Sequence, residues 1–164
     1  MRVRFAKLSP SENMTILVRD PIPREKHGEF GVELMRYGHI HAEQVGFIEE
    51  PQDKAADCRL QMLGGFCGNG MLSLAALFAH EKHTLPGNKI GVTMEADGAD
   101  KLLHCEITVL DEGLFSGRMS MPLPVSIEEA AVTVGGGSRE LRVVRFPGIT
   151  HFIAVEPNPT RARM

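Results

Sequence analysis

The stretch Gly64-Gly65-Phe66-Cys67-Gly68-Asn69-Gly70 runs directly into the apolar segment Met71–Ala79. Since that segment is apolar throughout, it predicts a helix that is buried on nearly all sides. The glycine pair allows a sharp turn after the preceding β-like run. This turn places Cys67 at or just before the first turn of the helix. We therefore expect the fold to be built around this helix.

The predicted position of Cys67 suits it to act as a base. The first amides of a helix have no partner within it, and the helix dipole adds partial positive charge there. Both effects stabilise a thiolate. The free amides of Gly68, Asn69 and Gly70 can hold a carboxylate. A thiolate beside that carboxylate can take the proton from the adjacent carbon, and a second group on the other face could return it. The alternative is a buried structural cysteine.

Outward from this helix, the chain alternates mostly between β-like runs and turns. The predicted strands are Val3–Leu8, Asn13–Val18, Gln44–Ile48, Arg59–Leu63, Lys89–Glu95, Leu102–Leu110, Phe115–Met121, Glu129–Val134, Leu141–Phe146 and Thr150–Val155. A second helix is predicted over Arg24–Tyr37, where Phe30, Leu34 and Tyr37 share one face. Together these elements predict an α+β fold, a curled, mainly antiparallel sheet wrapped around a central helix.

Composition excludes several classes of protein. The 164 residues are 43% hydrophobic and 24% charged, as in ordinary globular domains. The net charge of −3 lacks the basic footprint of a nucleic-acid binder. No window predicts a membrane span or a signal peptide. The three cysteines, an odd number, indicate free thiols in a reducing compartment, so we expect a cytoplasmic protein.

Neither a cofactor nor a metal site is predicted. The chain has no G-x-G-x-x-G motif after a strand, no Walker A sequence and no tight Cys/His cluster. His80 and His83 could offer two metal ligands, but no third is evident and polar residues commonly end a helix. Cys58 and Cys105 fall in predicted strands, which indicates core positions.

Three motifs, in order along the chain, resemble those of the diaminopimelate epimerase-like superfamily. Cys67-Gly68-Asn69-Gly70 is similar to the C-G-N-G signature of diaminopimelate epimerases. Arg59–Asn69 resembles more closely the M-x-G-G-E-F-C-G-N run of a branch that includes histidine racemases. Glu12–Val18 resembles the family's G-N-D-F strand, and Pro147–Val155 its G-x-x-H strand.

This resemblance implies two pseudo-symmetric domains, each a curled sheet around a helix. It also implies two facing cysteines that act as acid and base without a cofactor. Cys67 would be the base for one enantiomer, Gly68 and Asn69 would bind the α-carboxylate through backbone amides, and Asn13 would contact the substrate. Met71-Leu72-Ser73 departs from the continuation seen in diaminopimelate epimerases, which leaves the amino acid open.

The resemblance covers only the first of the two domains. We expect a single domain over residues 1–156, with residues 157–164 a polar tail or the start of an interdomain linker. The second thiol would come from the rest of a longer chain, from a separate second-half polypeptide, or from a homodimer mate whose Cys67 faces this one. Alternative functions are a non-catalytic small-carboxylate-binding half-domain, and a phenazine-biosynthesis-like or proline racemase-like isomerase.

Overall fold

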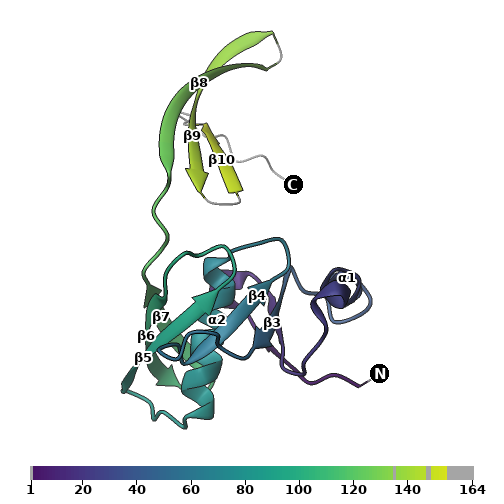
Figure 1. Cartoon of the computed structure of the whole chain (residues 1–164), viewed down its shortest axis with the longest axis vertical. Helices are drawn as coiled ribbons and strands as arrows, with labels where there is room; N and C mark the ends of the chain where they lie inside the picture. Colours follow the sequence, from purple (N-terminus) through teal and green to yellow (C-terminus); the bar gives the residue numbers. More distant parts are fainter. Residues whose placement is uncertain (1, 135, 147–148, 155–164) are drawn as a thin grey trace. The chain divides into compact units, whose positions relative to one another are not determined.

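A computed structural model describes residues 2–134, 136–146 and 149–154 (Figure 1). The chain divides into two compact units, Met1–Met121 and Pro122–Met164. Strands dominate both, and the described residues include two α-helices, so the predicted α+β class is confirmed. The single domain predicted over residues 1–156 spans both units and stays a prediction. The tail predicted at 157–164 lies outside the described residues.

The first unit contains a seven-stranded sheet whose strands lie side by side in sequence order. The strands are β1 Phe5–Leu8, β2 Thr15–Val18, β3 Gln44–Glu49, β4 Cys58–Met62, β5 Lys89–Ala96, β6 Leu103–Asp111 and β7 Leu114–Met119. Neighbours are antiparallel except the parallel pairs β2–β3 and β4–β5. A parallel pair requires a crossover connection. Helix α1 (His27–Met35) lies in the first crossover and helix α2 (Gly68–Glu81) in the second.

The two helices pack on opposite faces of this sheet. Successive side chains of a strand point to opposite faces. In β2, Leu17 accordingly joins the core cluster around α2, whereas Ile16 and Val18 join the cluster around α1. Helix α2 contacts every strand from β2 to β7 and buries most of its side chains, as the apolar run predicted. That the sheet curls around this helix stays a prediction.

The second predicted helix is shorter than expected. Residues Arg24–Lys26 form one 3-10 turn, and α1 ends at Met35 because Arg36 adopts an extended conformation, with ψ of 137°. Tyr37 therefore lies beyond the helix and is 87% exposed. The prediction that one helix covers Arg24–Tyr37, with Tyr37 on the same face as Phe30, was wrong, since α1 ends at Met35.

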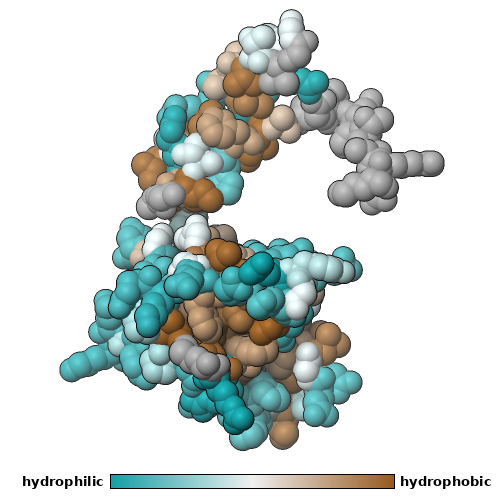
Figure 2. Space-filling model, turned by 90° about the vertical axis from the view of Figure 1, so that its right-hand side faces the viewer, coloured by the Kyte–Doolittle hydropathy of each residue, from teal (hydrophilic) through white to brown (hydrophobic). Residues whose placement is uncertain are grey.

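The second unit is an antiparallel sheet in the order β10-β9-β8. Its strands are β8 Ser126–Val134, β9 Gly137–Phe146 and β10 Ile149–Ala154. Among its described residues Val143 is buried, whereas Ile127 and Phe152 are exposed. Figure 2 shows hydrophobic side chains on the surface of this unit. Within the described residues of this unit no helix covers either face of the sheet.

Candidate active site at the start of helix α2

A glycine-mediated turn brings Cys67 to the start of α2. After β4 ends at Met62, Gly64 and Gly65 adopt φ values of +90° and +105°, which glycine tolerates without steric cost. Cys67 is extended, with φ of −139°, and its carbonyl oxygen accepts a hydrogen bond from Met71 N at 3.1 Å. Cys67 is thus the N-cap residue of α2, as its predicted position required.

Both the helix and the sheet hold the Cys67 thiol. The Gly70 N–H donates to Cys67 Sγ at 3.4 Å. The thiol donates to Gln44 Oε1 at 3.1 Å. Thr15 Oγ1 lies 3.2 Å from the same amide oxygen and 3.2 Å from Asn13 O, although its single proton can serve only one of these acceptors at a time.

Gln44 is a site residue that the sequence analysis missed. It begins β3 and pairs with Thr15 of the parallel strand β2, which brings its amide to the thiol. A thiolate cannot donate a hydrogen bond, so ionisation of Cys67 breaks this bond unless the amide turns to present its N–H group. Gln44 can therefore contact either protonation state of the sulfur.

The glycine after Asn69 allows α2 to begin close to the sheet. A Cβ added at Gly70 would overlap Met62 Sδ, and one added at Gly46 of β3 would lie 2.7 Å from the same sulfur atom. Gly68 and Asn69 are half-buried and belong to the first turn of the helix. The structure thus brings all three predicted carboxylate-binding residues to the thiol's end of α2.

Asn13 also lies in this neighbourhood. Its backbone oxygen is 3.2 Å from Thr15 Oγ1, which in turn contacts Gln44. Its side-chain Oδ1 is buried and has no hydrogen-bond partner in the described part of the chain. A buried polar atom of this kind normally has a partner, and a bound ligand can supply one.

The other two cysteines lie in the core. Burial raises the pKa of the Cys58 thiol to about 12, with further contributions from Asp57 and Cys105. Burial likewise raises the pKa of the Cys105 thiol to about 11. Both stay protonated at neutral pH, which agrees with their predicted core positions.

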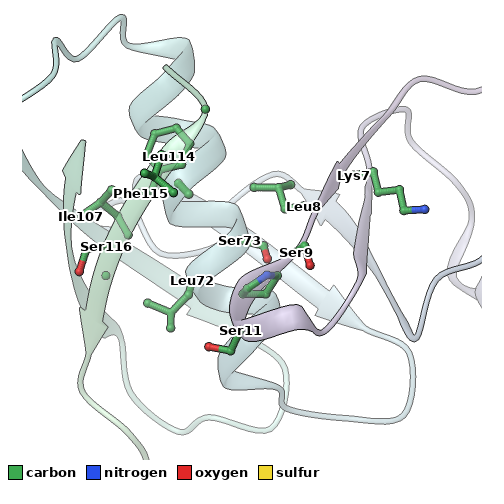
Figure 3. Close-up of a pocket in the computed structure, with 14 residues that line it drawn as sticks. Lys7, Leu8, Ser9, Ser11, Leu72, Ser73, Ile107, Leu114, Phe115 and Ser116 are labelled. Carbon is green, nitrogen blue, oxygen red and sulfur yellow. The ribbon is translucent and has the colours of Figure 1, made fainter. Parts of the chain in front are cut away.

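A cavity of about 510 Å³ lies elsewhere in the first unit, over α2 between the segments around β1 and β7 (Figure 3). It is lined by Lys7, Leu8, Ser9, Pro10, Ser11, Leu72, Ser73, Ala76, Ile107, Gly113, Leu114, Phe115, Ser116 and Gly117. Cys67 is not in its lining. The candidate site is therefore separate from this cavity.

The described residues lack two further kinds of feature. No group of three or more His, Cys, Asp or Glu side chains is placed to hold a metal ion. No described helix has the length and apolar character that crossing a bilayer requires.

Comparisons by sequence point to one family. Residues 2–163 match the family model described as "Histidine racemase CntK N-terminal domain". The histidine racemase of Fusobacterium nucleatum subsp. nucleatum is 33% identical over 152 residues, which cover 91% of this chain and 53% of the relative. That of Staphylococcus aureus is 36% identical over 153 residues, covering 92% and 54%. The chain thus spans about half the length of these curated relatives.

Solved structures share the fold at low identity. A hydroxyproline epimerase from Agrobacterium vitis matches with a TM-score of 0.73 and 11% identity, over 93% of this chain and 51% of that one. A probable proline racemase from Agrobacterium radiobacter K84 matches with a TM-score of 0.73 and 13% identity, over 93% and 52%. At such identities the likeness shows the fold alone.

Proposed function

Because this chain belongs to the family of histidine racemase CntK N-terminal domains, we propose that it supplies one half of a cofactor-independent amino-acid racemase or epimerase in the cytoplasm. The observation that carries the proposal is the position of the Cys67 sulfur at the start of the buried helix α2. There it lies 3.4 Å from Gly70 N and 3.1 Å from Gln44 Oε1. The thiol thus lies at a helix N-terminus. The match to half the length of the curated relatives agrees with one half of an enzyme.

In the proposed reaction, Cys67 takes or returns the α-proton of the substrate. The thiolate forms an S–H bond as the Cα–H bond breaks, and the bonding electron pair delocalises into the substrate carboxylate. The amides of Gly68, Asn69 and Gly70 hold that carboxylate and stabilise its added charge. A second thiol then protonates Cα from the opposite face, which yields the other enantiomer. Asn13, with its unpartnered Oδ1, contacts the bound substrate.

The second thiol comes from outside the described residues of this chain. Three sources fit: the remainder of a longer chain, a separate second-half polypeptide, or Cys67 of a second copy across a two-fold axis. The curated relatives named histidine racemase are about twice the matched length, which favours a second half over a symmetric pair. Their printed names make histidine the first substrate to test.

Deuterium incorporation at Cα of L-histidine in heavy water tests the proposal. We expect exchange and racemisation from the chain alone at high concentration, or after adding the second half of a relative. Light scattering identifies the assembly responsible. Cys67→Ser is expected to lose about 100-fold or more of the exchange rate, whereas Cys58→Ala, the buried control, keeps it. An assembled protein that binds histidine and never exchanges its α-proton is instead a carboxylate-binding module.

A further inference from the structure

The first unit contains a partly buried ion cluster that the proposed reaction does not use. At its centre is Arg59 of β4, whose side chain is only 7% exposed. Its Nε lies 3.1 Å from Glu49, and its terminal nitrogens lie 2.7 Å from Glu95 and 2.7 Å from Asp97. Arg24 binds the same Asp97 at 2.8 Å from a more exposed position. Two guanidinium groups thus hold three carboxylates.

This cluster joins the ends of several strands. Glu49 ends β3, and Asp97 directly follows β5. Glu95 also accepts hydrogen bonds from the backbone N–H groups of the loop residues Gln52 and Asp53, at 2.7 and 3.1 Å. Buried charges persist only when they are paired, so these contacts are costly to break. The planar fork of an arginine can serve three carboxylates, which the compact ammonium of a lysine cannot.

One end of the cluster leads to the loop before Cys67. Asp97 is followed by Gly98, whose φ is +84°. A Cβ added at Gly98 would lie 3.4 Å from Phe66 Cβ and 3.6 Å from Phe66 N. The turn therefore packs directly against the residue that precedes Cys67. Since the glycine pair at 64–65 gives this loop little stiffness of its own, the turn is a lateral support for it.

We propose that Arg59 is a positioning residue for Cys67. By holding Asp97, it keeps Gly98 against Phe66, and this contact fixes the position of Cys67 at the N-terminus of α2. The catalytic meaning of this inference rests on the proposed function, but the geometry can be tested without activity. A shift of Phe66 moves the cysteine sulfur relative to Gly70 N and Gln44 Oε1. Those two contacts define the surroundings in which the thiol ionises and reacts.

The test is the rate at which iodoacetamide alkylates Cys67 in the full chain, followed by mass spectrometry over about pH 6 to 9. Asp97→Asn and Arg59→Lys are expected to lower the rate at neutral pH about 3- to 10-fold, because small misplacements have large effects on reactivity. Arg4→Lys is the matched control, since it alters an exposed pair with Asp20 and should leave the rate unchanged. Cooperative thermal unfolding shows that each variant is folded.

The sign of the change separates positioning from charge. Removing the Asp97 carboxylate would by itself favour the thiolate and raise the rate, whereas loss of support lowers it. An unchanged or faster rate in folded Asp97→Asn and Arg59→Lys overturns the inference. If both fail to fold, Arg24→Lys replaces the outer guanidinium, which is half exposed, without changing the charge. We expect a rate about 2-fold lower there, and an unchanged rate again overturns the inference.

The same experiment keeps this inference distinct from the proposed function. A parent chain that alkylates as expected, with slower variants, but never exchanges the α-proton of any amino acid even when assembled with a second half, refutes the racemase and leaves the positioning role standing. If the assembled enzyme racemises, the same variants are expected to lower kcat more than they raise KM. Normal kcat and normal alkylation in both variants would refute the positioning role alone.

Discussion

The two units of this chain differ in how completely they bury their apolar side chains. In the first unit, α2 lies against six strands, and Leu74 on that helix is 3% exposed. In the second unit, Val143 is 4% exposed, but Phe152 on the neighbouring strand is 67% exposed. A sheet buries an apolar face only where a second layer covers it. In the first unit that layer is the helix that Cys67 caps, so the core and the candidate site depend on one element.

Truncating one buried side chain in each unit tests this difference most directly. Leu74→Ala is expected to lower the free energy of unfolding by about 2–5 kcal/mol, because it leaves a cavity in a packed core. Val143→Ala is expected to cost less than about 1 kcal/mol, since the surrounding sheet can relax into solvent. Urea unfolding followed by circular dichroism measures both. Equal losses would mean that the second unit is packed as tightly as the first.

A smaller effect is expected from a glycine at the close approach of α2 to the sheet. In Gly70→Ala the new methyl group overlaps buried Met62, and we expect a loss of about 1–3 kcal/mol. Gly28→Ala in α1 is the matched control, because a Cβ there meets nothing within 4 Å. That control should gain about 0.5–1 kcal/mol from its lower backbone entropy when unfolded. If Gly70→Ala changed the free energy of unfolding as the control does, the close packing of the first turn of α2 against the sheet would not contribute to the stability of the first unit.

The smallest expected difference is in acid sensitivity. Burial by itself would raise the pKa of Asp97, but hydrogen bonds and charge from Arg24 and Arg59 outweigh it and hold the pKa below its ordinary value of 3.8. The stabilisation is therefore present above about pH 4 and is lost as the pH falls through the depressed folded value. The pKa of Glu128 in the second unit is also lowered, first by the Ser126 hydroxyl, but water screens this exposed group.

Urea unfolding between about pH 5 and pH 2 measures this difference. Asp97→Asn should flatten the acid-induced loss of stability in the first unit, whereas Glu128→Gln should leave it unchanged. A parent-like slope in Asp97→Asn would show that the ion cluster contributes nothing to the acid response.

Local patterns predicted most of the elements and the central part of the candidate site. The apolar run after Gly70 predicted a buried helix, and the glycine pair before Phe66 predicted its sharp approach, which placed Cys67 correctly. The prediction failed at Tyr37, where the periodicity of three apolar residues did not reveal that the helix ends at Met35. Helix ends depend on one or two backbone angles, and side-chain spacing carries little information about them.

Other site residues had no local signal. Gln44 reaches the thiol from 23 residues away in the sequence, and Arg59 reaches Glu95 and Asp97 from 36 and 38 residues away. A glutamine at the start of a strand, or an arginine inside one, is ordinary in isolation. Their importance comes from the register of β2 against β3 and of β4 against β5.

The sequence by itself determined the α+β class, the buried helix and the position of Cys67 at the N-terminus of that helix. Through its motifs it also determined the family. Each of these depends on neighbours within a few residues, where periodicity, glycine conformations and helix-end chemistry act directly. Only the tertiary structure decided which distant groups meet: the Gln44 amide at the thiol, the turn at Gly98 against Phe66, and the ion cluster behind that turn. These contacts follow from strand register and helix packing, in which the free energy is shared by the whole sheet rather than by any one segment.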